Sequence, residues 1–336
     1  MTVTQAYSSP HGVLVAGDAN VDLVLRGDVV PRFGQAEQLL DSGELVLGGS
    51  ASITACGLAR LGVPTSLVAR VGDDAFGRFT TDALVGSGVD VSAVEIDGST
   101  PTGISVILSA PGDRAILTVP GTIPTLQAGA VTAALAPSTR HVHFASYFLQ
   151  PDLAAGLPAL LGALRERGIT TSLDTNWDPA ETWTGLREVL PHLDFLLPNL
   201  EELRALASAL GAPGDSSDGS AALFLAALGP RVVVKAGRDG GWSVAADQPL
   251  VAAAGLTVEV VDTTGAGDSF NAGYLAALAF GISDEAERLR WATAAGSLST
   301  LGAGGTGAQA TRAELEIALE AALLTAPRDT AFATGA

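Results

Sequence analysis

One glycine-rich run combines backbone amides that could bind an anion with a carboxylate. It reads Asp262-Thr263-Thr264-Gly265-Ala266-Gly267-Asp268-Ser269-Phe270, and it lies between a β-branched segment, residues 258–261, and a long apolar stretch with helical spacing. Glycine adopts backbone conformations that are closed to other residues, so successive amides can point at one spot. At a helix N-terminus such amides, together with the helix dipole, favour a bound anion. The run therefore predicts a phosphate site.

Asp268 places a carboxylate inside this predicted anion site. It would repel a bound phosphate, so its presence indicates a chemical role. In phosphoryl transfer an aspartate orients the attacking hydroxyl and accepts its proton, while the surrounding groups supply positioning and charge stabilisation. Asp268 is therefore our candidate base. A purely structural alternative is that Asp268 caps the helix.

A second candidate group follows an apolar strand, in the run Pro198-Asn199-Leu200-Glu201-Glu202. Asn199 and Glu202 are three residues apart at a predicted helix start, so both side chains share one face. There the carboxylate of Glu202 could hold a hydrated Mg²⁺. The same two residues also fit a capping box, which is a structural role.

A third group, Lys235-Ala236-Gly237-Arg238-Asp239-Gly240-Gly241, ends another apolar strand. Lys235 or Arg238 could neutralise the phosphates of a nucleotide, and Gly237 could offer a backbone contact. A surface β-turn explains the glycines equally well.

The elements that must position these groups alternate along the chain. Short apolar, β-branched runs are separated by longer Ala/Leu-rich segments with helical spacing. This alternation predicts an α/β fold in which helices cover both faces of a mostly parallel sheet. The clearest strand candidates are residues 13–16, 65–71, 141–145, 171–174, 195–197 and 231–235, and the clearest late helices are residues 267–280, 284–301 and 311–324.

Two regions break this rhythm, at about residues 20–47 and 102–120. The second contains paired runs, residues 103–108 and 114–119, on either side of a Pro-Gly turn. We predict that both regions form antiparallel strands that stand off the main sheet as a lid over a cleft. The alternative is two ordinary surface hairpins. The whole is predicted to be one domain, residues 10–325, followed by a flexible tail at residues 326–336.

Composition limits the possible partners. The formal net charge of −18 disfavours nucleic acid and anionic membranes as partners.

The N-terminal residues lack the pattern of a secretory signal, and no apolar run approaches the length that a bilayer requires, so a cytoplasmic location is expected. The single Cys56 excludes an internal disulfide.

Two segments together resemble the signatures of a known family. The run from Asp262 to Phe270 resembles the C-terminal signature of the ribokinase-like sugar kinases, also called the phosphofructokinase B family. An earlier segment resembles the N-terminal signature of the same family. It reads Leu47-Gly48-Gly49-Ser50-Ala51-Ser52-Ile53-Thr54-Ala55-Cys56-Gly57-Leu58-Ala59-Arg60-Leu61-Gly62, continued by Arg70-Val71-Gly72-Asp73-Asp74-Ala75-Phe76-Gly77. The resemblance implies a Rossmann-like αβα sandwich with a small β-sheet lid. It also implies ATP and Mg²⁺ as co-substrates and, as in many members, stimulation by K⁺.

The resemblance also implies roles for individual residues. Asp268 becomes the catalytic base, and the amides of Gly265, Ala266 and Gly267 become the anion hole. Asp22 matches a carboxylate that grips sugar hydroxyls, with Asn20 as its neighbour, and Gly48 and Gly49 belong to the same substrate side. Residues near the nucleotide are Asn199, Lys235, Gly237, Gly240, Thr264 and Gly304; Glu202 would hold Mg²⁺ through water, and Asp262 and Thr264 would hold a monovalent cation. Asp174, Asn176 and Asp178 resemble a segment near the phosphates, where they could support Mg²⁺ or simply form a turn.

One position departs from the family pattern. Five residues after Gly48 the family commonly has asparagine, and this chain has Ile53. A branched alkyl group cannot read a sugar hydroxyl as an amide does, so ribose itself is disfavoured. Ile53 instead favours a deoxy, bulkier or partly apolar acceptor.

The sequence leaves other functions open. One is a nucleoside kinase of the same family, and another is a sugar-binding sensor without catalysis. A third, a nicotinamide-dependent oxidoreductase, rests on Gly302-Ala303-Gly304-Gly305-Thr306-Gly307 alone, which follows a predicted helix and not a strand. Because open lid edges are often covered by a partner subunit, we also expect a homodimer through the lid.

Overall fold

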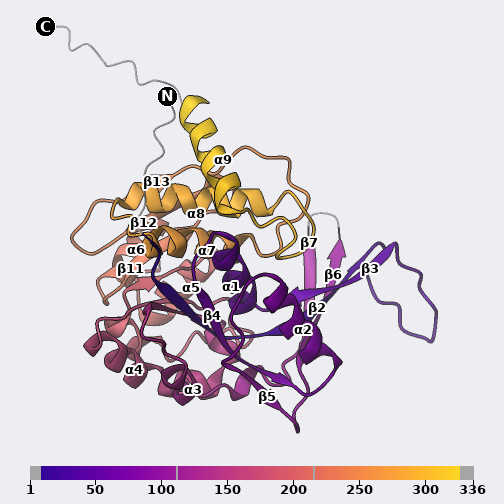
Figure 1. Cartoon of the computed structure of the whole chain (residues 1–336). Coiled ribbons are helices and arrows are strands. Elements are labelled where there is room, and N and C mark those ends of the chain that lie inside the picture. Colours follow the sequence, from indigo (N-terminus) through magenta and orange to yellow (C-terminus); the bar gives the residue numbers. More distant parts are fainter. Residues whose placement is uncertain (1–8, 111–112, 215, 326–336) are drawn as a thin grey trace, which may run out of the picture.

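The structure is a computed structural model that describes residues 9–110, 113–214 and 216–325. Two sheets and the helices around them make up the fold (Figure 1). The tail predicted at residues 326–336 lies outside the described residues. None of the helices in the described ranges combines the length and the apolar character needed to cross a membrane.

The main sheet confirms the predicted mostly parallel arrangement. Within the described chain it has nine strands, and its only antiparallel pairings there are β11 with β12 and β12 with β13. Each of the six strands expected from the sequence belongs to it. In spatial order the strands are β13 (Val251–Ala253), β12 (Gly241–Val244), β11 (Arg231–Lys235), β10 (Phe195–Leu196), β9 (Thr170–Asp174), β8 (Thr139–Ala145), β1 (Gly12–Ala16), β4 (Thr65–Gly72) and β5 (Val94–Asp97).

Helices cover both faces of this sheet because its strands are apolar on both sides. Along β1, Val13 and Val15 join one buried cluster, and Leu14 and Ala16 join the other. This follows from the strand period of two, which sends successive side chains to opposite faces. The first face carries α1 (Ser50–Arg60), α2 (Ala75–Gly86), α7 (Ala266–Ala279), α8 (Glu285–Ser299) and α9 (Arg312–Thr325), and the second carries α3 (Ala128–Ala133), α4 (Pro151–Glu166), α5 (Leu200–Leu210) and α6 (Asp218–Ala226).

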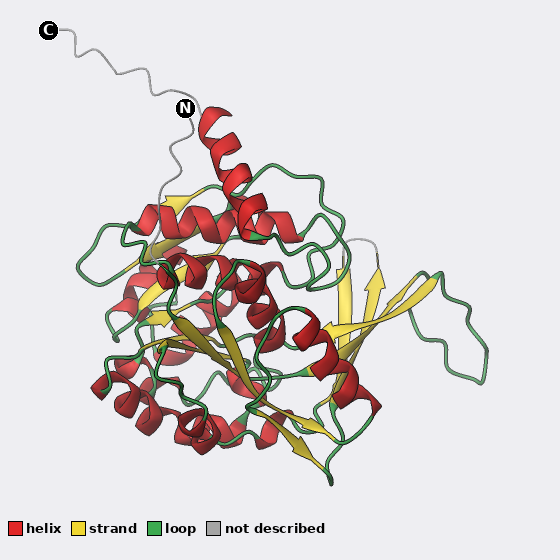
Figure 2. Cartoon of the chain, in the orientation of Figure 1, coloured by secondary structure: helices red, strands yellow, loops and turns green. Residues whose placement is uncertain are grey.

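The lid is a separate four-stranded sheet in the described residues, and it stands off one side of the helix-covered body (Figure 2). Its spatial order is β3 (Ser42–Gly48), β2 (Asn20–Arg26), β6 (Gly103–Ala110) and β7 (Asp113–Val119). The predicted antiparallel strands are confirmed within each region, β2 with β3 and β6 with β7, and the two regions join through β2 and β6, which pair in parallel. They are not joined by a hairpin: the chain returns to the main sheet through β4 and β5 between them, and such a crossover permits parallel pairing.

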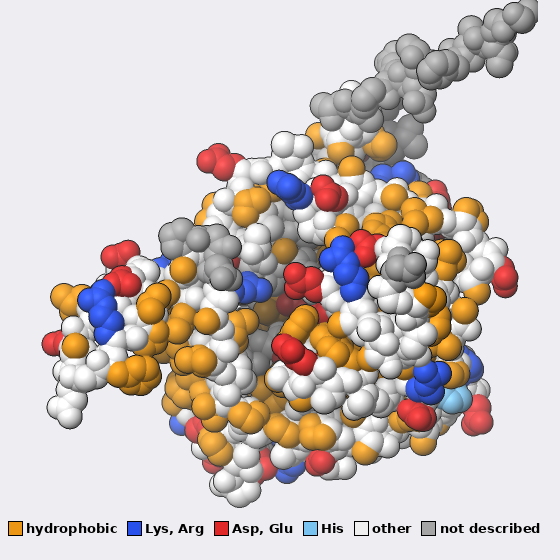
Figure 3. All heavy atoms as spheres, turned by 180° about the vertical axis from the view of Figure 1, so that it is seen from behind, with side chains coloured by type: hydrophobic (Ala, Val, Ile, Leu, Met, Phe, Trp, Pro, Cys, Tyr) orange, Lys and Arg blue, Asp and Glu red, His pale blue; other side chains and the backbone are white. Residues whose placement is uncertain are grey.

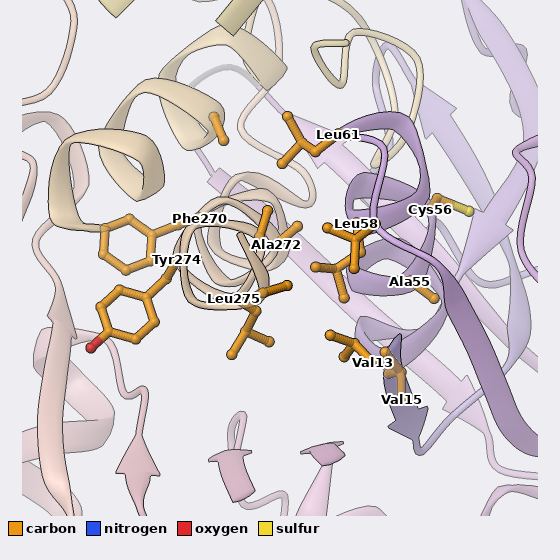
Figure 4. Close-up of a cluster of buried hydrophobic side chains, with 14 of the residues drawn as sticks. Val13, Val15, Ala55, Cys56, Leu58, Leu61, Phe270, Ala272, Tyr274 and Leu275 are labelled. Carbon is orange, nitrogen blue, oxygen red and sulfur yellow. The ribbon is translucent and has the colours of Figure 1, made fainter. Parts of the chain in front are cut away.

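Glycines allow the helices of the first face to approach closely. A Cβ atom on Gly57 of α1 would lie 2.7 Å from the Cβ of Ala272, and one on Gly273 of α7 would lie 2.6 Å from the carbonyl oxygen of Trp291 and 2.8 Å from the Cβ of Ala295 in α8. Figure 4 shows α7 among the buried side chains of this cluster. Close packing here fixes α7, whose N-terminus carries the predicted anion site.

We therefore expect Gly273→Val to lower the free energy of unfolding by roughly 1–3 kcal/mol, as overpacked core positions typically do. Gly162→Ala in α4 is the matched control, because a Cβ there meets no atom within 4 Å. That control should leave stability unchanged or raise it by up to about 1 kcal/mol, through better helix propensity. Urea unfolding of both variants measures the difference. Equal stability of the two would contradict the close contact of α7 with α8.

Candidate active site

The predicted site residues meet at one edge of the main sheet. Because β1, β8, β9, β10 and β11 run parallel to one another, their carboxyl ends lie at the same edge. Asp174, Asn199 and Lys235 lie at or directly after three of these ends, and α7 begins beside them. Crevices at this edge are where open α/β sheets bind ligands.

The anion site predicted at residues 265–267 forms the start of α7. Gly265 is the N-cap residue and has φ of 70°, a left-handed conformation that favours glycine. Its lack of a side chain is also needed for packing, because a Cβ there would lie 2.7 Å from the Cα of Gly305. The amide of Ala266 already donates to the carbonyl of Thr263 at 3.2 Å. The amides of Gly265 and Gly267 are therefore the better placed of the three to bind an anion.

Asp268 lies in the first turn of α7 and is partly buried. Ser50 Oγ, at the start of α1, donates a hydrogen bond to Asp268 Oδ1 at 2.5 Å. Desolvation raises the pKa of Asp268 to about 7, the carboxylates of Asp174 and Asp18 act in the same direction, and Ser50 and Lys235 oppose them. A carboxylate with a pKa near neutrality is suited to accept a proton.

A buried ion pair that sequence reasoning missed lies beneath Asp268. Lys235 Nζ is 2.5 Å from Asp174 Oδ2, and Asn271 Nδ2 of α7 donates to the same oxygen at 2.6 Å. Burial lowers the pKa of Lys235, but the carboxylates of Asp174, Glu202 and Asp268 outweigh burial and keep the lysine charged. Lys235 was predicted to face a nucleotide phosphate. At least one of its three ammonium donors is instead bonded to Asp174.

Asn199 and Glu202 form the capping box that was the structural alternative. Asn199 Oδ1 accepts from the amide of Glu202, and Glu202 Oε2 accepts from the amide of Asn199, both at 2.8 Å. Glu202 is buried, and desolvation raises its pKa to about 7, with Asp174 adding to the effect and Lys235 opposing it. No group of three or more His, Cys, Asp or Glu side chains suited to a metal occurs in the described part of the chain.

The predicted substrate side lies at the root of the lid. Asn20 Nδ2 donates to Asp22 Oδ1 at 2.9 Å. Only glycine fits at position 48, because a Cβ there would lie 2.1 Å from Asp22 Oδ1 and 2.6 Å from Asn20 Nδ2. Desolvation raises the pKa of Asp22 to about 6, Asp18 adds to the effect, and Asn20 and Arg114 oppose it.

Asp18 and Ser50 were not assigned roles from the sequence, although Ser50 lies within the segment that resembles the N-terminal signature. The buried carboxylate of Asp18 accepts hydrogen bonds from the amides of Ser50 at 3.1 Å and Ala51 at 3.0 Å, at the start of α1. Gly49, with φ of 91°, makes the turn that brings this helix start to Asp18, since a Cβ there would lie 2.7 Å from the Asp18 carbonyl oxygen. Asp18 therefore anchors α1 and, through Ser50, orients Asp268.

A cavity of about 490 Å³ extends from the start of α7. Figure 3 shows a hollow between the lid and the body with acidic and basic side chains around it. The cavity wall combines apolar side chains with glycines, and it includes three of the predicted nucleotide residues, Lys235, Gly237 and Gly240, together with Ala266 and Gly267 of the anion site. Apolar lining residues are Leu256, Val258, Val260 and Phe270. Residues 258–261 form no strand and instead make part of this wall.

Other predicted residues lie outside the cavity lining. Ile53 is buried and faces the loop after α8, because a Cβ on Gly305 would lie 2.5 Å from Ile53 Cδ1. Gly304 donates its amide to Asp262 Oδ2 at 3.1 Å. The loop at residues 302–307 therefore packs on the anion site and follows a helix, so it lacks the strand–turn–helix context of a dinucleotide fingerprint.

Thr264 donates two hydrogen bonds to Asp262, and two arginines of the lid reach these residues. Arg26 Nη2 of β2 is 3.2 Å from Asp262 Oδ2, and Arg114 Nη1 of β7 donates to Thr264 Oγ1 at 3.2 Å. Burial raises the pKa of Asp262, but the amides of Gly304 and Thr264 and the charge of Arg26 together hold it below its ordinary value. Neither arginine was singled out by sequence reasoning.

Comparison with known proteins identifies the family to which this arrangement belongs. Residues 11–312 match the sequence profile of the pfkB family carbohydrate kinases. The chain belongs to the pfkB family. It is 29% identical over 308 residues to the ribokinase of Bacillus subtilis, covering 91% of this chain and 98% of that enzyme. It is 30% identical over 306 residues to the fructokinase of Klebsiella pneumoniae, covering 87% and 94% of the two chains.

Solved structures agree with this family. The ribokinase of Arabidopsis thaliana, complexed with ribose and ATP, superposes with a TM-score of 0.80 at 26% identity, over 93% of this chain and 99% of that one. This pfkB-family chain is therefore an ATP-dependent sugar kinase with the ribokinase fold, and the predicted fold and enzyme class are confirmed.

The hydrogen bond from Ser50 to Asp268 leads to a pH prediction for this kinase. Asp268, the base predicted from the sequence, would have to be deprotonated to work, so kcat/KM should rise with pH through about 7, the pKa of this carboxyl. Ser50→Ala removes a bond that favours the ionised form, so its acidic limb should move to higher pH. Ser52→Ala is the control, because that buried hydroxyl in the same helix bonds the Asp18 carbonyl. If the acidic limbs of the pH profiles coincide for the native protein, Ser50→Ala and Ser52→Ala, the contact between Ser50 and Asp268 is contradicted.

Proposed function

We propose that this kinase transfers the γ-phosphoryl group of Mg·ATP to a hydroxyl of a sugar or sugar derivative, with Asp268 as the base. The single observation that carries the proposal is the place of Asp268 between two sites. Its helix start lines the cavity suited to a nucleotide, and its carboxylate bonds Ser50, which directly follows the glycine pair beside Asp22 and Asn20.

The mechanism follows from this arrangement. The apolar cavity wall takes the nucleotide base, and the start of α7 takes the terminal phosphates at the amides of Gly265 and Gly267. Asp22, oriented by Asn20, accepts hydrogen bonds from sugar hydroxyls. The acceptor oxygen then bonds to the γ-phosphorus, the bond from that phosphorus to the bridging oxygen of ADP breaks, and the hydroxyl proton passes to Asp268.

Magnesium fits this donor set. Mg²⁺ in kinases uses one or two carboxylates, the substrate phosphates and water, so no dedicated protein cage is required. Glu202, through water, is our proposed ligand, and the carboxylates of Asp174 and Glu201 add negative charge near it that a divalent cation would offset. When bound, Mg²⁺ neutralises charge on the phosphates. Lys235 adds a positive charge from the carboxyl end of the neighbouring strand β11.

The acceptor remains a sugar or sugar derivative. Named relatives include ribokinases, fructokinases and, at 32% identity over 289 residues, an ATP-dependent ribose-1-phosphate kinase of Halopiger xanaduensis, covering 85% of this chain and 91% of that one. Ile53 offers no hydrogen bond where the family commonly has asparagine, so we propose an acceptor that is less polar than ribose at the position next to it. A nucleoside is the alternative acceptor.

The test is ATP-to-ADP turnover with Mg²⁺ against pentoses, hexoses, 2-keto-3-deoxy sugar acids and nucleosides. On the best acceptor, Asp268→Asn should lower kcat roughly 10²- to 10⁴-fold, the usual loss for an acid–base group. ATP affinity, measured by calorimetry, should change little. The control is Asp247→Asn, an exposed carboxylate between β12 and β13. Native-like turnover in Asp268→Asn would refute the base, and ATP binding without turnover on any acceptor would favour a sensor.

A homodimer through the outer face of the lid is also proposed. Cross-strand partners share one face of a sheet, and the row Leu45, Leu23, Val106 and Leu117 runs across all four lid strands on the face opposite Asp22. Leu117 and Val119 are 58% and 59% exposed, which is unusual for large apolar side chains grouped on one face.

Light scattering should therefore give the mass of two chains for the native protein. Leu117→Asp should shift the mass toward one chain, since it would bury an unpaired charge in the interface. Leu223→Asp, at an exposed position of α6, should leave the dimer intact. A single-chain mass for the native protein would contradict the proposed interface.

A further inference from the structure

The carboxylate of Asp262 has no remaining place for the monovalent cation that the family resemblance assigned to it. Its Oδ1 accepts from the amide of Thr264 at 2.9 Å and from Thr264 Oγ1 at 2.8 Å. Its Oδ2 accepts from the amide of Gly304 at 3.1 Å and from Arg26 Nη2 at 3.2 Å. An ionised carboxylate offers about four lone-pair directions. These four hydrogen bonds fill all the lone-pair directions of Asp262, so its carboxylate does not fit the role of a K⁺ ligand.

The positive charge already present at Asp262 also argues against a bound K⁺ ion. The guanidinium of Arg26 already supplies a positive charge at Asp262, and its other side faces Glu44, with Nη1 3.7 Å from Glu44 Oε2. A K⁺ ion at the same carboxylate would lie within a few ångströms of this permanent cation and be repelled by it. By contrast, the fructokinase of Vibrio cholerae, which is 24% identical to this chain, has been solved with a bound potassium ion.

The position of Arg26 in the lid makes this contact a link between distant parts of the site. The lid row Ser42, Arg26, Ser109 and Arg114 runs across all four strands on one face. From this row Arg26 reaches Asp262 and Arg114 reaches Thr264. Both contacts fall on the segment that leads directly into Gly265, the N-cap of the anion site.

The same carboxylate also holds the second loop of the anion site. Through the amide of Gly304, Asp262 ties down residues 302–307, and Gly305 of that loop packs against Gly265. A cation at Asp262 thus fixes both loops around the phosphate site. In this chain that cation is carried by the lid.

We propose that Arg26 is an internal cation that replaces the monovalent ion at Asp262, so that the seating of the lid, and not K⁺, positions the anion site. The inference rests on the proposed kinase activity for its catalytic consequence but not for its ion chemistry. Arg26 is a positioning residue, since it acts on the phosphate site through Asp262.

The first test compares the native enzyme in potassium chloride and in tetramethylammonium chloride at equal ionic strength. Turnover should be the same in both salts, and the thermal unfolding midpoint should not rise with K⁺, because an ion that binds the folded state would stabilise it. Several-fold activation of the native enzyme by K⁺, or a K⁺-dependent rise in its midpoint, would overturn the proposal. The unfolding measurement stands even if the acceptor sugar is misassigned.

The second test removes the internal cation. Arg26→Met should lower kcat/KM roughly tenfold or more, as displaced positioning groups do, and K⁺ should now restore part of the rate and raise the unfolding midpoint. Arg26→Lys keeps a cation and should remain insensitive to K⁺. The matched control is Arg32→Met, an exposed arginine in the β2–β3 connection that pairs with Asp28; it should behave as native. Native-like activity of Arg26→Met in tetramethylammonium would contradict the assigned role.

Discussion

The ion pair between Lys235 and Asp174 is the interaction around which the site is arranged. It joins the ends of β11 and β9, and Asn271 adds α7 to the same oxygen. Two charges removed from water are costly unless their geometry is good and their other hydrogen bonds are made, and here the bonds are short and shared. Because α7 is fixed at this point, the amides at its start and the carboxylate of Asp268 have a defined position relative to the sheet.

The same pair sets the protonation of its neighbours. Asp268 and Glu202 are both buried beside this pair, and desolvation outweighs the opposing charge of Lys235, so both carboxylates have a pKa of about 7. Acidic groups gathered around one lysine favour a bound divalent cation. Their raised pKa values also suit a base that works near neutral pH. The net charge of −18 makes this local arrangement necessary, since the protein as a whole repels an anionic nucleotide.

The lid adds a second constraint, which comes from the strand period of two. One face of the lid carries Asp22, Arg26 and Arg114, and the other carries the exposed leucines and valines. A shift of register by one residue would exchange these faces and remove both arginines from the cleft. The register of the lid sheet therefore keeps its charged site residues on one face and the exposed leucines and valines on the other.

Much of this could be predicted from the sequence, where the signal is local. The strands of the main sheet are short apolar, β-branched runs, the late helices repeat with a period of 3.6, and the Gly-Ala-Gly-Asp run marks its own helix start. The lid regions were located, but the parallel pairing of β2 with β6 was not, because it depends on where the chain goes between them. Asn199 and Glu202 were placed correctly at a helix start, where the capping box is also a local pattern.

The sequence by itself thus determined the α/β architecture and the glycine-rich helix start that forms the proposed phosphate site, since both depend on neighbours a few positions away. Only the tertiary structure decided which charge faces which. Ser50 and Asp268 are 218 positions apart, and Arg26 and Asp262 are 236 apart. No periodicity encodes such pairs, because they arise when loops at the ends of different strands are brought to one edge of a sheet. That convergence gave Lys235 its carboxylate partner and placed an arginine at Asp262.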